Sequence, residues 1–301
     1  MPTRVAESTT ASDLSASKDY LTTKPFERFL RTDPKVTYVE ESDSTLRRFV
    51  IDRVERLMGR GEVDRIYQEL KEPDFNAQVF FKEALERGNI KLQYDEAQLA
   101  KVPATGPVVF VANHPFGIID GLGLCNLAMK CRGNFQILIH AILCQDKDLL
   151  PHFLPIDFTQ HRDARKTNIY TKRVALQSLE NDVPILIFPS GGIATADKLG
   201  FGEVEDRPWT TFAAKLIQQS GATVIPCFFQ GRNSRLFQFA SYIAEPLRLA
   251  LLLNEIVNKF DSTVGISIGD PITSEEISEL GSRADITKAL HAKVWNLQDS
   301  H

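Results

Sequence analysis

Short, almost purely apolar runs alternate with segments of helical periodicity along most of this chain of 301 residues. Such runs are typical of strands buried on both faces of a parallel sheet, and the segments between them are long enough for crossover helices. The apolar runs cover residues 90–94, 107–112, 137–142, 185–188, 224–229 and 264–268. The helical segments cover residues 121–130, 166–179, 209–219, 286–297 and 236–253, the last interrupted by Pro246. The alternation predicts an α/β fold with a mainly parallel central sheet flanked by helices.

The chain before the first of these runs has a different pattern. Residues 1–43 are polar and predict an N-terminal arm that is mobile or lies extended over the domain. Helical spacing at about 44–58 and 76–87 predicts an N-terminal helical segment over residues 44–88. The sequence shows no internal repeat. We therefore expect a single α/β domain over residues 44–301.

The helix expected at 44–58 is amphipathic. Its apolar residues at helical spacing are Leu46, Phe49, Val50, Val54, Leu57 and Met58. Its polar side carries Arg47, Arg48, Arg53 and Arg56 against Asp52 and Glu55. A basic face of this kind can rest on anionic lipid, but a surface helix that packs on the core has a similar pattern. The sequence leaves both interpretations open.

The overall charge argues against nucleic acid as a partner, because a net charge of -4 gives no general attraction to a polyanion. Four scattered cysteines form no Cys-x-x-Cys pair, and no His/Cys cluster has the spacing of a zinc site. We expect reduced thiols and no metal.

The sequence also indicates where the protein works. It has no run of about 18 uninterrupted apolar residues, so no segment is expected to span a membrane. The N-terminus lacks the basic and then apolar pattern of a secretory signal. We expect a cytoplasmic protein that, if it uses a membrane, is peripheral on its inner face.

The segment after the second apolar run carries the strongest chemical signal. Asn113 and His114 directly follow the strand, at the edge where parallel sheets bind ligands. Pro115 and Gly117 then force a bend. Because of this bend, the carboxylate of Asp120 can fold back onto the imidazole of His114. The segment predicts a His/Asp pair beside a substrate crevice, with Asn113, Pro115 and Gly117 lining it.

Such a pair can act on a hydroxyl group. A neutral imidazole accepts a proton from an alcohol, and a carboxylate on its other nitrogen fixes the tautomer and stabilises the cation that forms. A lone His beside an Asp is nevertheless more often structural, so the pair needs support from the rest of the sequence.

A second candidate site follows the apolar run at 185–188, where the chain reads Pro189-Ser190-Gly191-Gly192. The flexible backbone of this turn can approach a ligand and offer amide donors to a phosphate or an oxyanion. A plain strand-to-loop turn has the same composition. The turn supports a site only in combination with the His/Asp motif.

Together these segments resemble a known family. The segment Asn113-His114-Pro115-Phe116-Gly117-Ile118-Ile119-Asp120-Gly121 resembles the His/Asp motif of the glycerolipid (lysophospholipid) acyltransferase superfamily. With five residues between His and Asp, it is similar to the branch of hemolysin-like and ornithine-lipid-type acyltransferases. Three later segments agree in order and spacing: Leu154-Pro155-Ile156-Asp157 with Arg162, Arg165 and Asn168; Ile187 to Gly192; and Val224-Ile225-Pro226 leading to Gly231-Arg232-Asn233-Ser234. The resemblance spans about residues 44–275.

The resemblance implies transfer of a fatty acyl group from acyl-coenzyme A or acyl carrier protein to the hydroxyl of a lysolipid, such as a lysophospholipid or a lyso-ornithine lipid. In this role His114 would be the general base and Asp120 its orienter, without a cofactor. Phe188 and the turn that follows it would line the acceptor site. Backbone amides near Gly117 or Gly191 would stabilise the oxyanion.

One departure from the family affects the acceptor. The commonest family motif reads Phe-Pro-Glu-Gly-Thr-Arg, whereas here Ser190 replaces Glu, and Gly192 and Ile193 replace Thr and Arg. An acceptor-binding arginine is therefore missing. Side chains that could bind the phosphate or carboxylate instead, unless they are solvated surface or turn residues, are Arg162, Arg165, Arg232 and Asn233.

Three points stay open. Residues 247–253 could form an acyl-chain wall, an interfacial surface or part of the core. A hydrolase could use the same His/Asp pair to activate water on a thioester or an ester. A non-catalytic lipid-binding protein would account for the altered acceptor motif.

Overall fold

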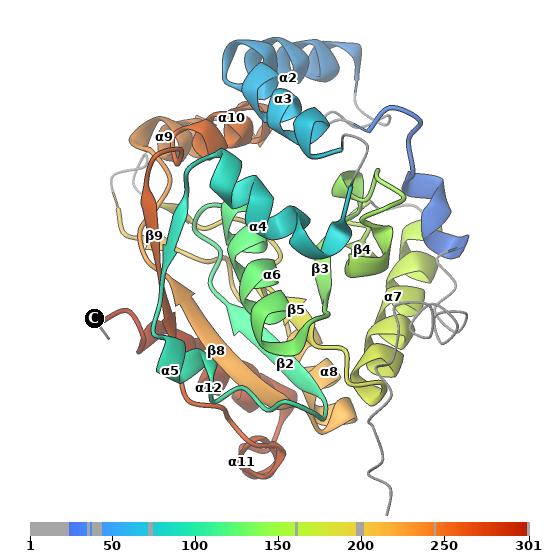
Figure 1. Ribbon diagram of the computed structural model, residues 1–301, viewed down its shortest axis with the longest axis vertical. Coiled ribbons are helices and arrows are strands. Elements are labelled where there is room, and N and C mark those ends of the chain that lie inside the picture. Colours follow the sequence, from blue (N-terminus) through green and yellow to red (C-terminus); the bar gives the residue numbers. More distant parts are fainter. Residues whose placement is uncertain are drawn as a thin grey trace, which may run out of the picture.

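The computed structural model describes residues 24–34, 37, 44–71, 75–159, 162–196, 202–243 and 245–299, without the side chains of residues 162, 245 and 246. A seven-stranded sheet in the order β1-β9-β8-β2-β5-β3-β4 forms its centre (Figure 1). The strands are β1 (Lys91–Gln93), β2 (Val108–Ala112), β3 (Gln136–His140), β4 (Phe153–Ile156), β5 (Ile185–Ile187), β8 (Thr223–Phe229) and β9 (Thr263–Ile268). Neighbouring strands are parallel except β8 and β9, which are antiparallel. The predicted mainly parallel sheet is confirmed.

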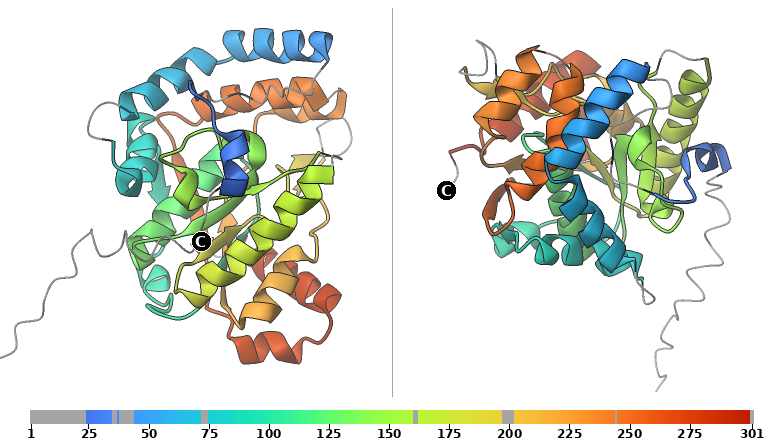
Figure 2. Two further views of the ribbon diagram at one scale, coloured as in Figure 1. Left: turned by 90° about the vertical axis from the view of Figure 1, so that its right-hand side faces the viewer. Right: turned by 90° about the horizontal axis from the view of Figure 1, so that it is seen from above.

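Both faces of the sheet are covered by helices. On one face lie α3 (Arg60–Leu70), α4 (Ala77–Arg87), α6 (Ile118–Arg132) and α10 (Glu245–Val257). On the other lie α7 (Arg162–Glu180), α8 (Phe212–Ser220) and α12 (Arg283–Trp295) (Figure 2). Strand β2 shows why its sequence is continuously apolar: Phe110 and its even-numbered neighbours pack on the first face, while Val109 and Val111 pack on the second.

Smaller elements complete the fold. They are η2 (Lys24–Phe29), α2 (Thr45–Leu57), α5 (Glu96–Leu99), η3 (Ala141–Leu143), η4 (Leu150–His152), the hairpin β6 (Thr195–Ala196) with β7 (Val204–Glu205), α9 (Arg235–Ile243) and α11 (Ser274–Glu279). Pro246 lies in the first turn of α10, where its missing N–H removes no helical hydrogen bond. The patterned segment at 236–253 is therefore two helices.

The predicted polar arm is described only in part. Within η2, Phe26 is buried and its ring lies 5.5 Å from that of Tyr170 on α7. Arg28 pairs with Asp157 at 2.6 Å. These contacts tie residues 24–29 to the domain, and the remainder of the arm, apart from 30–34 and 37, lies outside the described residues.

Helix α2 differs from its predicted pattern. Glu55, assigned to the polar side, is fully buried and accepts hydrogen bonds from Thr37 at 2.7 Å and Arg60 at 3.4 Å. Phe49 and Leu57, assigned to the apolar side, are 58% and 81% exposed. Partners distant in sequence decide which side of α2 faces inward, and helical periodicity does not contain that information.

No helix among these ranges is both long enough and apolar enough to cross a bilayer.

Candidate active site

The site is built on the end of β2, which lies in the sheet between β5 and β8. Asn113, the first residue after β2, is buried. Its Nδ2 donates to the carbonyl oxygen of Phe229 at 3.0 Å, and its Oδ1 accepts from the Phe229 N–H at 2.7 Å. From its place after the strand, Asn113 is expected to bind substrate. In the structure its amide is engaged by the backbone of β8 and fixes the start of the His114 loop.

The bend after His114 brings the predicted pair together. His114 Nδ1 lies 3.0 Å from Asp120 Oδ2, and this oxygen also accepts the N–H groups of Phe116 at 2.7 Å and Gly117 at 2.9 Å. Gly117 has φ +86° and ψ -116°, which is essentially restricted to glycine. A Cβ at Gly117 would lie 2.7 Å from the side chain of Ile193. Both the backbone conformation and the lack of space therefore require glycine at the bend.

The imidazole is held on several sides. It stacks on the ring of Phe188 with centroids 4.0 Å apart and planes at 17°. The His114 N–H donates to Asp206 Oδ1 at 3.1 Å, and its carbonyl accepts from Ala194 at 2.8 Å. The side chain is 17% exposed and lines a cavity. Since Nδ1 is bonded to Asp120, and Nε2 has no hydrogen-bond partner among the described residues, Nε2 is left to face a ligand.

Two carboxyl groups lie beside His114, the buried one of Asp120 and the half-buried one of Asp206. Burial raises the pKa of Asp120 above its ordinary value, while the imidazole and the two backbone amides act in the opposite direction. Burial also raises the pKa of Asp206 to about 6, against the opposing hydrogen bond from the Trp209 indole. Asp120 lies in the first turn of α6, where the helix dipole favours negative charge. The donors around Asp120 thus favour the ionised form, which can stabilise a positively charged imidazole.

The turn after β5 is closed by its own hydrogen bonds. Ser190 Oγ donates to the carbonyl of Gly192 at 2.8 Å, and the Gly191 N–H donates to Phe188 O at 3.0 Å. The Gly117 N–H is likewise engaged, by Asp120. The amides of Gly117 and Gly191 themselves are therefore engaged, and an oxyanion donor near them has to be another backbone N–H. The Gly192 N–H, in contrast, donates to no acceptor in the described part of the chain.

A cavity of about 700 Å³ opens beside these groups. Its polar end is formed by His114, Phe188, Pro189, Ser190, Gly191 and Gly192. Its apolar walls come from α3, α4, α6 and α10, and include Val63, Ile66, Phe80, Phe81, Leu122, Leu249, Leu252 and Ile256. Residues of the segment 247–253 lie in two environments. Leu249 and Leu252 line the cavity, while Leu251 and Leu253 are buried in the core.

The predicted anion-binding side chains do not gather at this cavity. Arg165 lines a neighbouring cleft, and the side chain of Arg162 lies outside the described part of the structure. Arg232 is exposed, Asn233 is buried, and neither lines the cavity. The loop after β8 instead packs behind the His114 turn, since a Cβ at Gly231 would lie 3.0 Å from the ring of Phe116.

Sequence reasoning missed Arg207, an exposed cavity-lining residue. A Cβ at Gly192 would lie 3.5 Å from its Nη1, so the guanidinium lies over the turn beside the active site. No carboxylate pairs with Arg207 among the described residues. Neither Arg207 nor Asp206 belongs to a periodic segment or a motif, so no sequence signal could have identified them.

Within the described ranges, no three His, Cys, Asp or Glu side chains converge in a way that could hold a metal ion. All four cysteines have free thiols.

Comparison with known proteins adds independent findings. A family model described as "Acyltransferase" matches residues 46–301. The chain is 29% identical over 261 residues to a lyso-glycine lipid O-acyltransferase of Phocaeicola vulgatus, covering 83% of this chain and 88% of that protein. It is 25% identical over 233 residues to a lyso-glycine lipid O-acyltransferase of Bacteroides thetaiotaomicron, covering 75% and 81%. A solved structure, the 1-acyl-sn-glycerophosphate acyltransferase PlsC from Thermotoga maritima, aligns with a TM-score of 0.49 and 16% identity over 84% of this chain and 87% of that chain.

Proposed function

We propose that this chain, which belongs to the acyltransferase family, transfers a fatty acyl group from a thioester donor to the hydroxyl of a lysolipid, with His114 as the general base. The observation that carries this proposal is the contact of 3.0 Å between His114 Nδ1 and Asp120 Oδ2, at the polar end of an apolar cavity. The contact leaves Nε2 facing the space where a substrate would lie.

The reaction follows from this geometry. Nε2 of His114 takes the proton of the acceptor hydroxyl while its oxygen attacks the thioester carbonyl carbon. Asp120 stabilises the imidazolium, and the Gly192 N–H is our candidate donor to the oxyanion. Collapse of the tetrahedral intermediate breaks the C–S bond, and the imidazolium returns the proton to the leaving thiolate. No covalent acyl-enzyme is required.

The apolar walls suit the acyl chain. Leu249, Leu252 and Ile256 on α10 line the cavity together with Val63 and Ile66 on α3, so an alkyl chain would exchange water for hydrocarbon contacts. Each buried methylene contributes about 0.8 kcal/mol. This gain would anchor the acyl group while its carbonyl carbon lies beside His114.

We propose that the acceptor is a lysolipid with an anionic head group, as in the lyso-glycine lipids after which the two relatives are named. An N-acylated amino acid carries a free carboxylate. Arg207, which lies over Gly192 without a carboxylate partner among the described residues, supplies a guanidinium for this group. It would replace the arginine that the turn after β5 lacks.

Replacing Arg207 by alanine is therefore expected to raise the KM for the acceptor by about tenfold, the effect of losing one charge-assisted hydrogen bond. The KM for the donor should stay constant. Arg232→Ala is the matched control, because Arg232 is an exposed arginine outside the cavity. Steady-state kinetics with each substrate varied in turn would measure both constants. An unchanged acceptor KM in Arg207→Ala would remove this role.

We further propose that the enzyme is peripheral on the inner face of the membrane, where cytoplasmic thioesters meet lysolipids. Helices α2, α9 and α10 lie together at one end of the molecule (Figures 1 and 2). Exposed apolar side chains at this end are Leu46, Phe49 and Leu57 on α2 and Leu236, Phe239, Tyr242 and Ile243 on α9. Arg48, Arg53 and Arg56 are also exposed on α2 and suit anionic lipid.

The double variant Phe49→Glu, Leu57→Glu is expected to bind vesicles of phosphatidylglycerol and phosphatidylcholine at least tenfold more weakly, since both burial and charge then oppose contact with lipid. Cosedimentation of each protein with the vesicles would measure this binding. Leu280→Glu, at an exposed apolar residue after α11 at the opposite end, is the control. Equal vesicle binding by the wild type, the double variant and Leu280→Glu would contradict the proposal that this surface contacts lipid.

The proposed function is tested with purified protein and radiolabelled acyl-coenzyme A or acyl carrier protein, against lysophospholipids, lyso-ornithine lipids and lyso-glycine lipids. A labelled diacyl lipid that forms only with an acceptor is the expected product. Free fatty acid at the same rate with and without acceptor would indicate a hydrolase. Lipid binding without any product would indicate a non-catalytic protein.

A further inference from the structure

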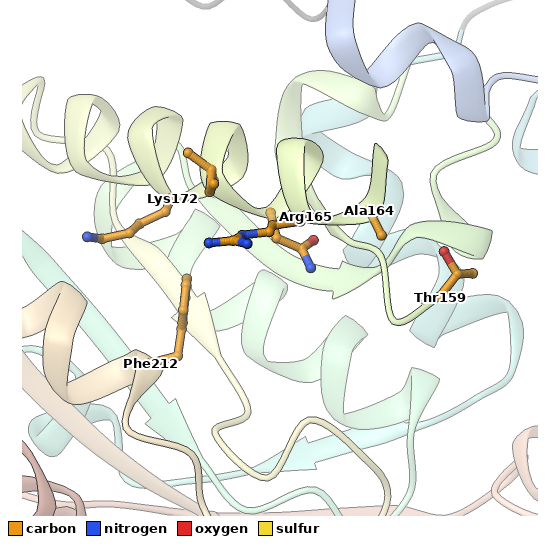
Figure 3. Close-up of a pocket in the computed structure, with 7 residues that line it drawn as sticks. Thr159, Ala164, Arg165, Lys172 and Phe212 are labelled. Carbon is orange, nitrogen blue, oxygen red and sulfur yellow. The ribbon is translucent and has the colours of Figure 1, made fainter. Parts of the chain in front are cut away.

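A second cleft adjoins the active-site cavity. It has a volume of about 460 Å³ and lies between α7 and the start of α8 (Figure 3). Its walls are Thr159, Ala164, Arg165, Asn168, Ile169, Lys172 and Phe212, and none of them is acidic. Arg165 and Lys172 are two helical turns apart and therefore share one face of α7. In Figure 3 the side chains of Arg165 and Lys172 extend from the side of the helix that faces Phe212.

Positive charge accumulates at this cleft. Lys215 of α8 and Arg283 of α12 lie near Lys172. Burial, together with the charges on these two neighbours, lowers the pKa of Lys172. Among the described residues, no carboxylate forms an ion pair with Arg165, Lys172 or Lys215. Like charges held together without a counter-charge repel one another, and a bound anion would relieve this repulsion.

The cleft lies next to the catalytic cavity. Asn168 and Phe212 line both spaces. Asn168 is fixed by two hydrogen bonds to the backbone of Asp157, at 2.8 and 2.9 Å, so this shared wall is rigid. A ligand in the cleft would therefore lie directly beside the cavity that His114 lines.

The two substrates differ in how far their anionic group lies from their reacting group. The anionic group of an acceptor lies a few bonds from its hydroxyl, so its partner must be close to His114, as Arg207 is. A thioester donor differs, because its pantetheine arm separates the reacting carbonyl from the nearest phosphate. A phosphate-binding cleft outside the catalytic cavity but next to it matches the donor.

Building on the proposed function, we propose that Arg165 and Lys172, with Lys215 beside them, bind the phosphate of the phosphopantetheine arm of the acyl donor. Both acyl-coenzyme A and acyl carrier protein carry this group. Arginine and lysine are the side chains that bind phosphate in proteins, the former through two parallel hydrogen bonds. The cleft thereby orients the arm so that the thioester enters the cavity beside His114.

The test compares donors with and without the phosphate. In the variant Arg165→Gln, Lys172→Gln, the KM for acyl-coenzyme A and for acyl-phosphopantetheine is expected to rise at least tenfold. The KM for acyl-pantetheine, which has no phosphate, and that for the acceptor should not change. Lys166→Gln is the control, because Lys166 is an exposed lysine of α7 that pairs with Asp163 outside the cleft. Equal effects on donors with and without phosphate would overturn the proposal.

A binding measurement keeps this test independent of turnover. Calorimetric titration of the full chain should show phosphopantetheine binding at least tenfold more tightly than pantetheine, and the double variant should abolish the difference. Similar affinities for the two compounds would overturn the cleft assignment even if acyl transfer occurs. Phosphate-dependent binding without transfer from any donor would instead contradict the proposed function. A further gain for coenzyme A over phosphopantetheine would indicate the free coenzyme as donor, and a gain for acyl carrier protein the protein-bound form.

Discussion

Replacing His114 by alanine is expected to lower kcat by at least about 100-fold, the usual effect of removing a general base. The acceptor hydroxyl would then have to lose its proton to water in a cavity that is largely apolar. Fold and substrate binding should persist, because the backbone of His114 is held by Asp206 and Ala194 through groups that alanine retains. Initial rates together with thermal unfolding of both proteins would measure the effect.

His140 provides the matched control. It lines the same cavity from the end of β3, and its Nδ1 accepts the N–H of Ile142 at 3.2 Å. His140→Ala is expected to change kcat far less than His114→Ala. Turnover near that of the wild type in His114→Ala, or equal losses in the two variants, would remove His114 from the mechanism.

The second large effect is expected from Asp120→Asn, which should lower kcat by about 100-fold while the bend after His114 keeps its hydrogen bonds. The amide oxygen of asparagine can take the place of Oδ2 and keep the hydrogen bonds from Phe116, Gly117 and His114 Nδ1. The NH2 group then occupies the position of Oδ1, which has no donor among the described residues. The variant therefore removes the charge that stabilises the imidazolium but keeps the geometry.

A comparison with Asp120→Ala separates the effect of the negative charge from the effect of the hydrogen bonds that hold the bend. The alanine variant would leave the N–H groups of Phe116 and Gly117 without their acceptor, and each unsatisfied buried donor costs about 1–3 kcal/mol. Its free energy of unfolding, from chemical denaturation, should therefore be lower than that of the wild type, and the bend should lose the two hydrogen bonds that Asp120→Asn keeps. Wild-type kcat in Asp120→Asn would show that the negative charge on Asp120 contributes nothing to turnover.

The sequence was most informative where the determinants are local. The alternation of apolar runs predicted the sheet, since every residue of β2 is buried between two helical layers. His114 and Asp120 could be paired because one bend, with a glycine at φ +86°, brings them together within six positions. The turn after β5 could be assigned to the site because its glycine-rich backbone can offer amide donors and because the segment resembles the family motif.

The remaining features depend on contacts between distant segments. Arg207 reaches the site from a loop without periodicity, and Asp206 holds His114 across 92 positions. Arg232 and Asn233 follow β8 at the expected edge, but their loop packs behind Phe116 rather than in the cavity. The inward turn of Glu55 on α2 likewise depends on tertiary partners. A linear pattern does not encode such contacts.

In the proposed reaction the acyl group passes directly to an acceptor hydroxyl that His114 deprotonates. The most direct test of this step is a single-turnover experiment with excess enzyme and radiolabelled acyl thioester, quenched with and without lysolipid. The label should remain in the thioester until lysolipid is added and then move entirely to diacyl lipid, without passing through a protein-bound form. Label that appears on the protein, or in free fatty acid without acceptor, would contradict direct transfer of the acyl group.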